Sequence, residues 1–335
     1  MKTATYFKHT LQFKRPGGTS RGVLHTKETY ILEIFENNRK GTGECGLFRG
    51  LSFDDVPDYE EKLKWLCTNI NQPYELILSE LINYPSIWFG YEQAMLNLKH
   101  GSDLYFPSEF TDGNETIKIN GLIWMGDAEF MKEQIDEKLS QGFSCIKLKI
   151  GVDWNSEKQI LKELRKNFPS SQIELRVDAN GGFTADEAPK VLEELAKLEI
   201  HSIEQPIKAG NWDQMAEICR NTPTPIALDE ELIGIVDFED KKQLLEKICP
   251  QYIILKPTLV GGFSGSDEWI SLAENLGIGW WITSALESNI GLNAIAQYTF
   301  TKGNLMPQGL GTGGLFTNNL DGNLTLSGDL LRIHR

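Results

Sequence analysis

Five apolar segments of this chain each end in a charged residue, and these residues recur at nearly constant intervals along the sequence. The separations are 29, 26, 25 and 27 residues, each close to the length of one strand–helix unit. Strands that alternate with helices form parallel sheets, and a closed sheet gathers its carboxyl ends at one mouth. The residues are, in chain order, Lys149, Asp178, Glu204, Asp229 and Lys256.

The second part of the chain has the element order of a (β/α)8 barrel. Apolar, β-rich runs predict strands at 116–124, 145–150, 173–178, 200–204, 225–229, 251–256 and 279–284, with a short eighth strand near 307–311. Helical periodicity predicts helices near 127–141, 155–167, 184–197, 211–221, 238–248, 264–276 and 288–300. Because no helix is expected after the eighth strand, we predict a modified barrel.

The first hundred residues have a different pattern. Strand signals up to about residue 36 precede helical periodicity at 54–100, which indicates a small α+β domain. Residues 14–22 contain too much glycine and proline for regular structure, and we predict a mobile loop there. We therefore expect an α+β capping domain at 1–110, a barrel at 111–314, and a tail at about 315–335 that packs on the first domain.

Residues 41–46, with the sequence GTGECG, formally match the GxGxxG pattern. A dinucleotide site needs a helix to open at these glycines, and residues 47–52 are not a helix start. We predict a glycine-rich turn and an extended segment instead.

Composition argues against several classes of protein. A net charge of −14 and a pI of about 4.9 disfavour a nucleic-acid partner. The five cysteines form no CxxC pair, which argues against disulfides or a zinc cluster and favours a reducing cytoplasm. Neither a signal peptide nor an apolar run of 18 residues is expected, so we predict no membrane insertion. The oligomeric state stays open.

Each charged strand end also has a purely structural explanation. The alternatives are a turn cap, a helix cap, a member of a solvated acidic cluster, and a lysine at an exposed strand end. These alternatives apply, in the same order, to Asp178, Glu204, Asp229 and Lys256. Lys147 and Lys149 could also face solvent together, from one side of their strand. One shared site explains the common spacing better than separate coincidences do.

Three carboxylates that converge from adjacent strands need a compensating cation. Oxygen-only ligands favour a hard divalent ion, so we predict that Asp178, Glu204 and Asp229 bind Mg²⁺, with Mn²⁺ able to substitute. A lysine on either side of the metal would then face the substrate, and burial beside like charge lowers a lysine pKa toward that of a general base. Such a site can remove a proton α to a carboxylate while the metal stabilises the enediolate.

This arrangement resembles the enolase superfamily over essentially the full chain. Lys147-Leu148-Lys149 is similar to the KxK motif of the second barrel strand, and the three acids are similar to the metal ligands of strands three to five. Lys256 is similar to the lysine of the sixth strand, which is typical of the subgroup that resembles muconate lactonizing enzyme. The resemblance implies a capping domain, a modified barrel and a small-molecule carboxylate substrate.

Within that subgroup, the chain most resembles the o-succinylbenzoate synthases. The similarity rests on 283–291, after the seventh strand, and on 15–22, where that family has a mobile loop. The Asp-x-Asp motif of dipeptide epimerases is absent at 309–314, which has the sequence GLGTGG. The resemblance implies a carbon–oxygen lyase of menaquinone biosynthesis that dehydrates 2-succinyl-6-hydroxy-2,4-cyclohexadiene-1-carboxylate to 2-succinylbenzoate.

The resemblance also implies roles for single residues. Lys149 would take the α-proton and then protonate the departing hydroxyl, while cationic Lys256 stabilises the enediolate. Lys147 is expected behind Lys149, where it lowers the pKa of Lys149. Asn180 is expected to support the metal or its bound water, and Arg176 to orient Asn180 or the substrate. Ser284 and Arg21 are expected to bind the succinyl tail.

Three alternatives remain. The same scaffold could racemise an N-acylamino acid or epimerise a dipeptide, with both lysines as bases; the missing Asp-x-Asp argues only against dipeptides. A barrel could also be a non-catalytic binding protein, which the intact set of two lysines and three acids disfavours. A phosphate-binding barrel enzyme could use the glycines of 309–314, but no lysine or arginine accompanies them.

Overall fold

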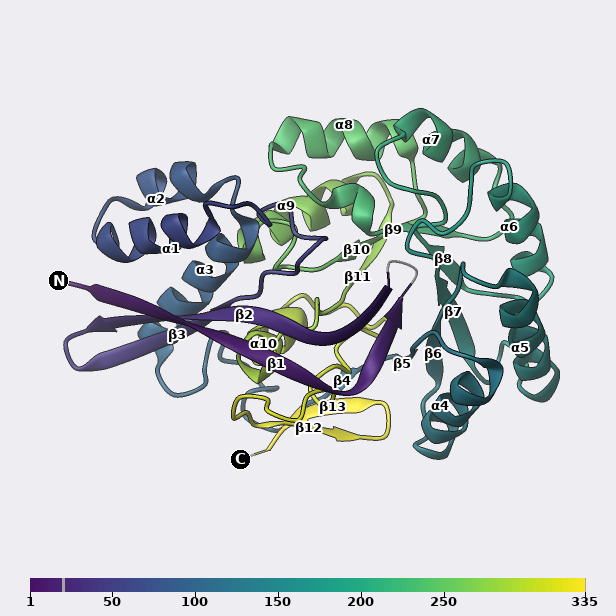
Figure 1. Ribbon diagram of the computed structural model, residues 1–335, viewed down its shortest axis with the longest axis horizontal. Helices are drawn as coiled ribbons and strands as arrows, with labels where there is room; N and C mark the ends of the chain where they lie inside the picture. The colour runs from purple at the N-terminus through teal and green to yellow at the C-terminus, as the bar shows by residue number, and fades with distance from the viewer. Residues whose placement is uncertain (20–21, 335) are drawn as a thin grey trace.

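The computed structural model describes residues 1–19 and 22–334 of the chain. The N-terminal part contains an antiparallel sheet and helices α1 to α3. It packs against a curved parallel sheet whose outer face is covered by helices (Figure 1). The α+β capping domain and the modified (β/α)8 barrel predicted from the sequence are confirmed by this architecture.

The N-terminal sheet has the order β1-β2-β3. β1 (Thr3–Thr19) and β2 (Gly22–Glu36) form a long hairpin that reaches from helices α1 to α3 to the barrel (Figure 1). β3 (Arg39–Cys45) follows a tight turn and contains most of the GxGxxG segment, so the predicted extended segment is confirmed. The helices are α1 (Tyr59–Thr68), α2 (Tyr74–Leu81) and α3 (Pro85–His100).

Residues 14–22 differ from the prediction of irregular structure, because β1 continues to Thr19 and β2 begins at Gly22. Within the described residues of the hairpin, the register between the strands shifts between Gln12 and Gly17. A Cβ on Gly18 would lie 2.5 Å from the Met125 carbonyl oxygen, so glycine lets the strand contact the barrel.

The barrel sheet has the order β11-β10-β9-β8-β7-β6-β5, and its neighbouring strands are parallel. The strands are β5 (Gly121–Ile123), β6 (Cys145–Lys149), β7 (Glu174–Asp178), β8 (Ser202–Glu204), β9 (Ile226–Leu228), β10 (Tyr252–Leu255) and β11 (Gly279–Ile282). The helices that follow them are α4 (Ala128–Ser140), α5 (Trp154–Asn167), α6 (Ala188–Ala196), α7 (Trp212–Asn221), α8 (Phe238–Ile248), α9 (Gly262–Asn275) and α10 (Asn289–Thr301), with a 3₁₀ turn η1 (Glu230–Leu232) after β9. The strands and helices predicted from residue 127 to residue 300 are confirmed, whereas the single strand predicted at 116–124 is two short strands in different sheets, β4 (Ile117–Lys118) and β5.

In the described chain, the position of the eighth barrel strand is occupied only by isolated β-bridges. Thr283 pairs with Gly309, and Ile119 pairs with Gln308. The Gln308 side chain accepts the backbone N–H of Ile282 at 2.8 Å, so a side chain supplies part of the ladder. The strand predicted near 307–311 is therefore reduced to single bridges.

The C-terminal tail contacts both parts of the molecule. β12 (Leu324–Ser327) and β13 (Leu330–Ile333) form a sheet with β4 (Ile117–Lys118), which leads into the barrel. Phe316 forms a bridge with Phe13 on β1, and their ring centres are 4.8 Å apart. None of the helices in the described part of the chain combines the length and apolar character needed to cross a lipid bilayer.

Two carboxylates of the N-terminal part cap consecutive barrel helices. Glu92 on α3 accepts the backbone N–H of Phe263, at the start of α9, at 2.6 Å. Glu44 on β3 accepts the backbone N–H groups of Ser288 and Gly291, at the start of α10, both at 2.9 Å. Helix N-termini attract negative charge, so these contacts join the N-terminal part to the barrel.

The cap formed by Glu92 predicts a pH dependence of stability. Burial raises the pKa of Glu92 to about 7, although hydrogen bonds from Ser264 and Phe263 act against the rise. The folded state therefore binds a proton that the unfolded state has already lost, and the free energy of unfolding falls as pH rises from about 4.5 to about 7. We expect Glu92→Gln to remove about 1–3 kcal/mol of this dependence in urea unfolding at pH 5 and 7.5. Equal pH dependence in the two proteins would contradict the assignment.

Candidate active site

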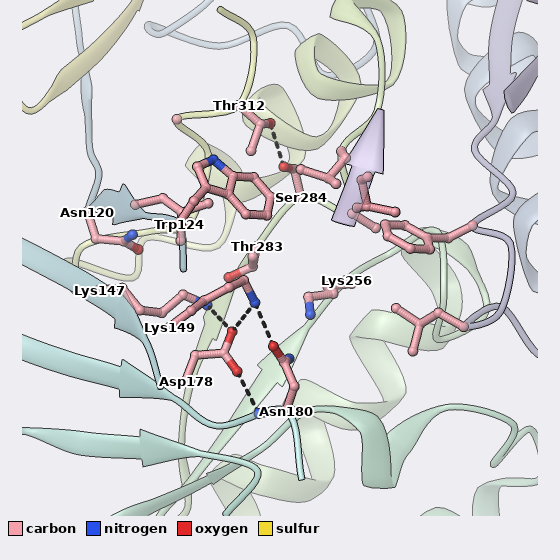
Figure 2. A pocket seen from close by; sticks show the side chains of 18 residues that line it. Asn120, Trp124, Lys147, Lys149, Asp178, Asn180, Lys256, Thr283, Ser284 and Thr312 are labelled. Atoms are coloured by element: carbon pink, nitrogen blue, oxygen red, sulfur yellow. Dashed lines mark hydrogen bonds and ion pairs between the residues drawn. The ribbon is translucent and has the colours of Figure 1, made fainter. Parts of the chain in front are cut away.

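The structure brings the charged strand ends together at the carboxyl edge of the parallel sheet. Lys149, Asp178 and Glu204 are the last residues of β6, β7 and β8, and they pair directly in register. Asp229 and Lys256 follow β9 and β10 immediately. All five residues are buried. Figure 2 shows Lys149, Asp178 and Lys256 around one pocket, with both ammonium groups turned toward the same space.

Lys147 and Lys149 share one carboxylate. Lys149 Nζ donates to Asp178 Oδ2 at 2.8 Å and to Asn180 Oδ1 at 2.7 Å. Lys147 Nζ donates to Glu204 Oε2 at 2.5 Å and lies 3.4 Å from Asp178 Oδ2. Because strand side chains alternate, both lysines lie on the inner face of β6.

The lysines and carboxylates compensate one another's burial. Burial opposes the charge of Lys147, but Glu204 and Asp178 outweigh it and raise the pKa of Lys147. Burial also opposes the charge of Asp178, yet Lys149 and Lys147 hold the pKa of this carboxyl well below its ordinary value. The predicted influence of Lys147 on Lys149 stays a prediction.

Lys256 enters the site from the other side. Its Nζ pairs with Asp229 Oδ2 and lies 3.7 Å from Glu204 Oε1. Burial opposes its charge, but Asp229 and Glu204 raise the pKa of Lys256. Burial raises the pKa of Asp229 despite the contact with Lys256, and the adjacent carboxylates of Glu230 and Glu204 add to this rise. The carboxylates therefore repel one another electrostatically even though lysines lie beside them.

The donor set fits a hard divalent cation. Glu204 Oε1 is buried and accepts no hydrogen bond, which leaves one carboxylate oxygen available between the strands of Asp178 and Asp229. Within residues 1–19 and 22–334, no group of three or more His, Cys, Asp or Glu is spaced to hold a metal as it stands. Each of the three carboxylates pairs instead with a lysine ammonium group.

Gln205 is a supporting residue that the sequence reasoning missed. Its Oε1 accepts the backbone N–H groups of Asp229 at 3.2 Å and Glu231 at 3.3 Å, so it joins the ends of β8 and β9. Its φ of 40° lies in the left-handed region, which is unfavourable for a residue with a Cβ. Its position directly after Glu204 was the signal that could have identified it.

Asn180 and Glu230 form a second supporting pair. Asn180, with φ of 44°, accepts from Lys149 and donates through Nδ2 to Glu230 Oε1 at 2.9 Å. Asn180 was predicted to lie at the metal or its water, whereas Glu230 was not predicted as a site residue. The adjacency of Glu230 to Asp229 was an available signal for its place in the site.

The pocket combines a charged floor with apolar sides. Its volume is about 70 Å³. Lys149 Nζ lies 6.0 Å from the centre of the Trp124 ring, an aromatic contact that the sequence analysis did not foresee. The apolar lining comes from both parts of the chain and consists of Leu24, Phe48, Leu51, Leu122, Trp124, Ala285 and Leu286.

The remaining predicted residues have different positions. Ser284 lines the pocket, and its hydroxyl lies 2.6 Å from that of Thr312. Arg176 requires a correction, because it lies deeper in the barrel: it donates to Glu174 and the Pro307 carbonyl and its guanidinium stacks 4.3 Å from the Trp281 ring centre. It shares the inner face with Asp178 but points to the opposite end of the barrel. Arg21 lies outside the described residues.

Gly309 gives a steric test of the pocket. A Cβ at this position would lie 2.3 Å from Thr283 Oγ1 and 2.9 Å from Thr283 Cβ, whereas a Cβ on Gly314 would have no neighbour within 4 Å. We expect Gly309→Ala to lower the free energy of unfolding by about 1–3 kcal/mol and Gly314→Ala to change it by at most about 0.5 kcal/mol, in urea unfolding. Equal effects of the two substitutions would refute the close contact.

Comparisons with known proteins identify the family. The enolase C-terminal domain-like family matches residues 130–324. The chain is 44% identical to o-succinylbenzoate synthase of Desulfotalea psychrophila over 98% of each chain. The crystal structure of MenC from the same organism superposes with a TM-score of 0.89 at 41% identity over 99% of each chain.

A more distant structure shares the fold alone. The dipeptide epimerase of Enterococcus faecalis, complexed with Mg and the dipeptide L-Leu-L-Tyr, has a TM-score of 0.85 at 20% identity, covering 100% of this chain and 98% of that one. The family match and the 44% identity over nearly the full chain establish the family of this protein. The chain belongs to the enolase superfamily and, within it, to the o-succinylbenzoate synthase family.

Proposed function

We propose that this chain catalyses the Mg²⁺-dependent dehydration of 2-succinyl-6-hydroxy-2,4-cyclohexadiene-1-carboxylate to 2-succinylbenzoate. The observation that carries the proposal is the convergence of Lys149 and Lys256 on one pocket above three buried carboxylates, in a chain 44% identical to an o-succinylbenzoate synthase. An aromatic product supplies a driving force, so the site has to position one C–H bond and one leaving hydroxyl.

Asp178, Glu204 and Asp229 would hold the Mg²⁺ ion. The ion supplies a fixed positive charge for the substrate carboxylate when bound. The donor set supports this role, because the three carboxylates stand at the ends of adjacent parallel strands and Glu204 Oε1 is buried without a hydrogen bond.

Lys149 is the proposed general base and general acid. As a neutral amine it removes the proton α to the substrate carboxylate, and as an ammonium it returns a proton to the departing hydroxyl, so that water leaves and the ring becomes aromatic. Asn180 Oδ1 accepts from Lys149 Nζ at 2.7 Å and fixes the direction of the side chain. Lys256 stays protonated beside Asp229 and stabilises negative charge on the substrate.

The apolar sides of the pocket suit the cyclohexadiene ring. The volume of about 70 Å³ is small beside the roughly 300–1,000 Å³ of typical ligand pockets, so the substrate enters only when part of the lining moves. Ser284 and Arg21 remain our candidates for the succinyl tail, and the cytoplasmic location stays a prediction from the cysteines.

Racemisation of an N-acylamino acid is the second candidate function. It is favoured by the entry of Lys149 and Lys256 from different strands with their ammonium groups facing one space (Figure 2). Among the described residues that line the pocket, Asp178 is the one carboxylate, and the segment 309–312 contributes Gly309, Gly311 and Thr312 instead of an acid for an α-ammonium group. Dipeptides are therefore disfavoured.

The proposed function predicts metal-dependent dehydration. Loss of the cyclohexadiene substrate, followed by ultraviolet absorbance, should require Mg²⁺ and stop with excess EDTA. Asp178→Asn, Glu204→Gln and Asp229→Asn should each weaken Mg²⁺ binding in calorimetry, because each removes a carboxylate charge. Unchanged Mg²⁺ titrations in all three variants would remove the metal site. Absent dehydration with Mg²⁺ bound would shift the assignment to racemisation, detected as exchange of the α-proton in D₂O.

The lysines should be essential in different ways. Lys149→Ala removes the group that transfers the proton and should lower kcat by about 10²–10⁴-fold, with circular dichroism unchanged. Lys256→Ala should also abolish measurable dehydration, because it removes the charge opposite Lys149. Lys158→Ala, on helix α5 in a half-buried pair with Glu194 and outside the pocket lining, is the control and should keep full activity. Near-normal turnover of Lys149→Ala would refute the base assignment.

A further inference from the structure

A buried charged cluster joins the N-terminal sheet to one side of the pocket. Its members are Lys27 on β2, Glu44 on β3, and Glu287 just before α10. Their side chains are 6%, 0% and 0% exposed. None of the three takes part in the proposed chemistry, and burying charges is costly even when they compensate one another. The cluster therefore needs another explanation.

Glu287 joins two segments that border the pocket. Its Oε2 accepts the backbone N–H of Ala285 at 2.7 Å, and its Oε1 accepts the Thr258 hydroxyl at 2.5 Å. Ala285 is the middle residue of the pocket wall, by which we mean Ser284–Leu286. Thr258 lies two residues after Lys256. One carboxylate thus connects the pocket wall with the segment that carries Lys256.

The pocket wall has a conformation that its own sequence does not favour. Leu286 has φ of 63°, in the left-handed region, where a residue with a bulky side chain is strained. Its side chain lines the pocket and is 7% exposed. Such a backbone persists only when surrounding contacts hold it, and the bond from Ala285 to Glu287 spans Leu286 directly.

The N-terminal sheet holds the other end of the wall. Glu44 accepts the Ser288 backbone N–H at 2.9 Å and the Ser288 hydroxyl at 2.5 Å, one residue beyond Glu287. Lys27 Nζ donates to the Gly46 carbonyl at 3.3 Å. A Cβ on Gly46 would lie 3.3 Å from Glu287 Cγ, so the residue to which Lys27 donates packs against Glu287. Burial lowers the pKa of Lys27, and the attraction of Glu44 and Glu287 opposes this effect.

We propose that Glu287 is a positioning residue that acts through the pocket wall, and that Lys27 and Glu44 hold it in place from the N-terminal sheet. The N-terminal part then sets how tightly the ligand binds, while Lys149, Lys256 and the carboxylates set the rate of the chemistry. The inference rests on the proposed function for the identity of the substrate. Its geometric basis, Glu287 between Ala285 and Thr258, is independent of that identity.

The test compares two variants at Glu287. Glu287→Ala loses both hydrogen bonds, whereas Glu287→Gln can accept from Ala285 and donate to Thr258. We expect Glu287→Ala to raise KM for the cyclohexadiene substrate by about 10-fold or more with kcat within about threefold, and Glu287→Gln to keep both within about threefold. Thr258→Val removes a single bond and should raise KM less, and it replaces Glu287→Ala if that variant does not fold.

Glu92→Ala is the matched control. Like Glu287→Ala, it removes a buried carboxylate that accepts hydrogen bonds from another segment, but Glu92 contacts the start of α9 and not the pocket wall. We expect a lower Tm and an unchanged KM. An equal rise of KM in Glu92→Ala, or a fall of kcat without a change of KM in Glu287→Ala, would overturn the positioning role.

Calorimetric binding of 2-succinylbenzoate gives a readout that needs no turnover. Glu287→Ala should weaken binding by about 10-fold, matching its effect on KM. A parent chain that binds this compound but performs no dehydration would remove the proposed function and leave the positioning role intact. Unchanged binding in Glu287→Ala would overturn the positioning role alone.

A double-mutant cycle tests the contribution of the N-terminal sheet. Lys27→Met leaves Glu44 and Glu287 buried without their cation, and adding Glu287→Gln removes one of the two charges. We therefore expect the double variant to bind 2-succinylbenzoate more tightly than the product of the single effects predicts. Strictly additive effects would show that Lys27 does not act on Glu287.

Discussion

The mutual neutralisation of lysines and carboxylates at the carboxyl edge of the barrel sheet is the constraint on which the site depends. Neither kind of charge could be buried alone at this depth without a large cost. Lys149 and Asp178 pair across β6 and β7, while Lys256 closes the set beyond β9. The register of the parallel strands is therefore tied to the chemistry, since a shift of one residue would send these charges to the opposite face.

The N-terminal part contributes both pocket-lining residues and helix caps. Leu24, Phe48 and Leu51 supply apolar lining, while Glu44 and Glu92 reach the amino ends of α10 and α9. A carboxylate at a helix N-terminus is satisfied by the N–H groups that the helix leaves free. The two parts therefore share a polar interface next to the site, which allows the N-terminal sheet to influence the shape of the pocket without touching the reacting groups.

The barrel and its charged strand ends could be predicted because they follow from periodic spacing, which can be read without knowledge of side-chain contacts. The family was predicted from the resemblance of particular motifs, such as Lys147-Leu148-Lys149. The sequence did not predict how deep in the barrel Arg176 lies. The alternation of side chains indicates which face of the sheet a residue is on, but not its position along the barrel axis. The eighth strand was overestimated because Gln308 uses its side chain where backbone was expected. Gln205, Glu230 and Trp124 were missed because their roles come from contacts between segments far apart in the chain.

The capping of α10 by Glu44 has a consequence for biosynthesis. Glu44 and its partner Ser288 are separated by 244 residues, and Phe13 meets Phe316 across an even longer stretch of chain. At about 5–20 residues per second, a ribosome needs on the order of ten to fifty seconds to make the intervening segment. During that interval the N-terminal sheet is exposed without its barrel partners. Chaperone protection of this nascent sheet would matter most while the last third of the chain is still being synthesised.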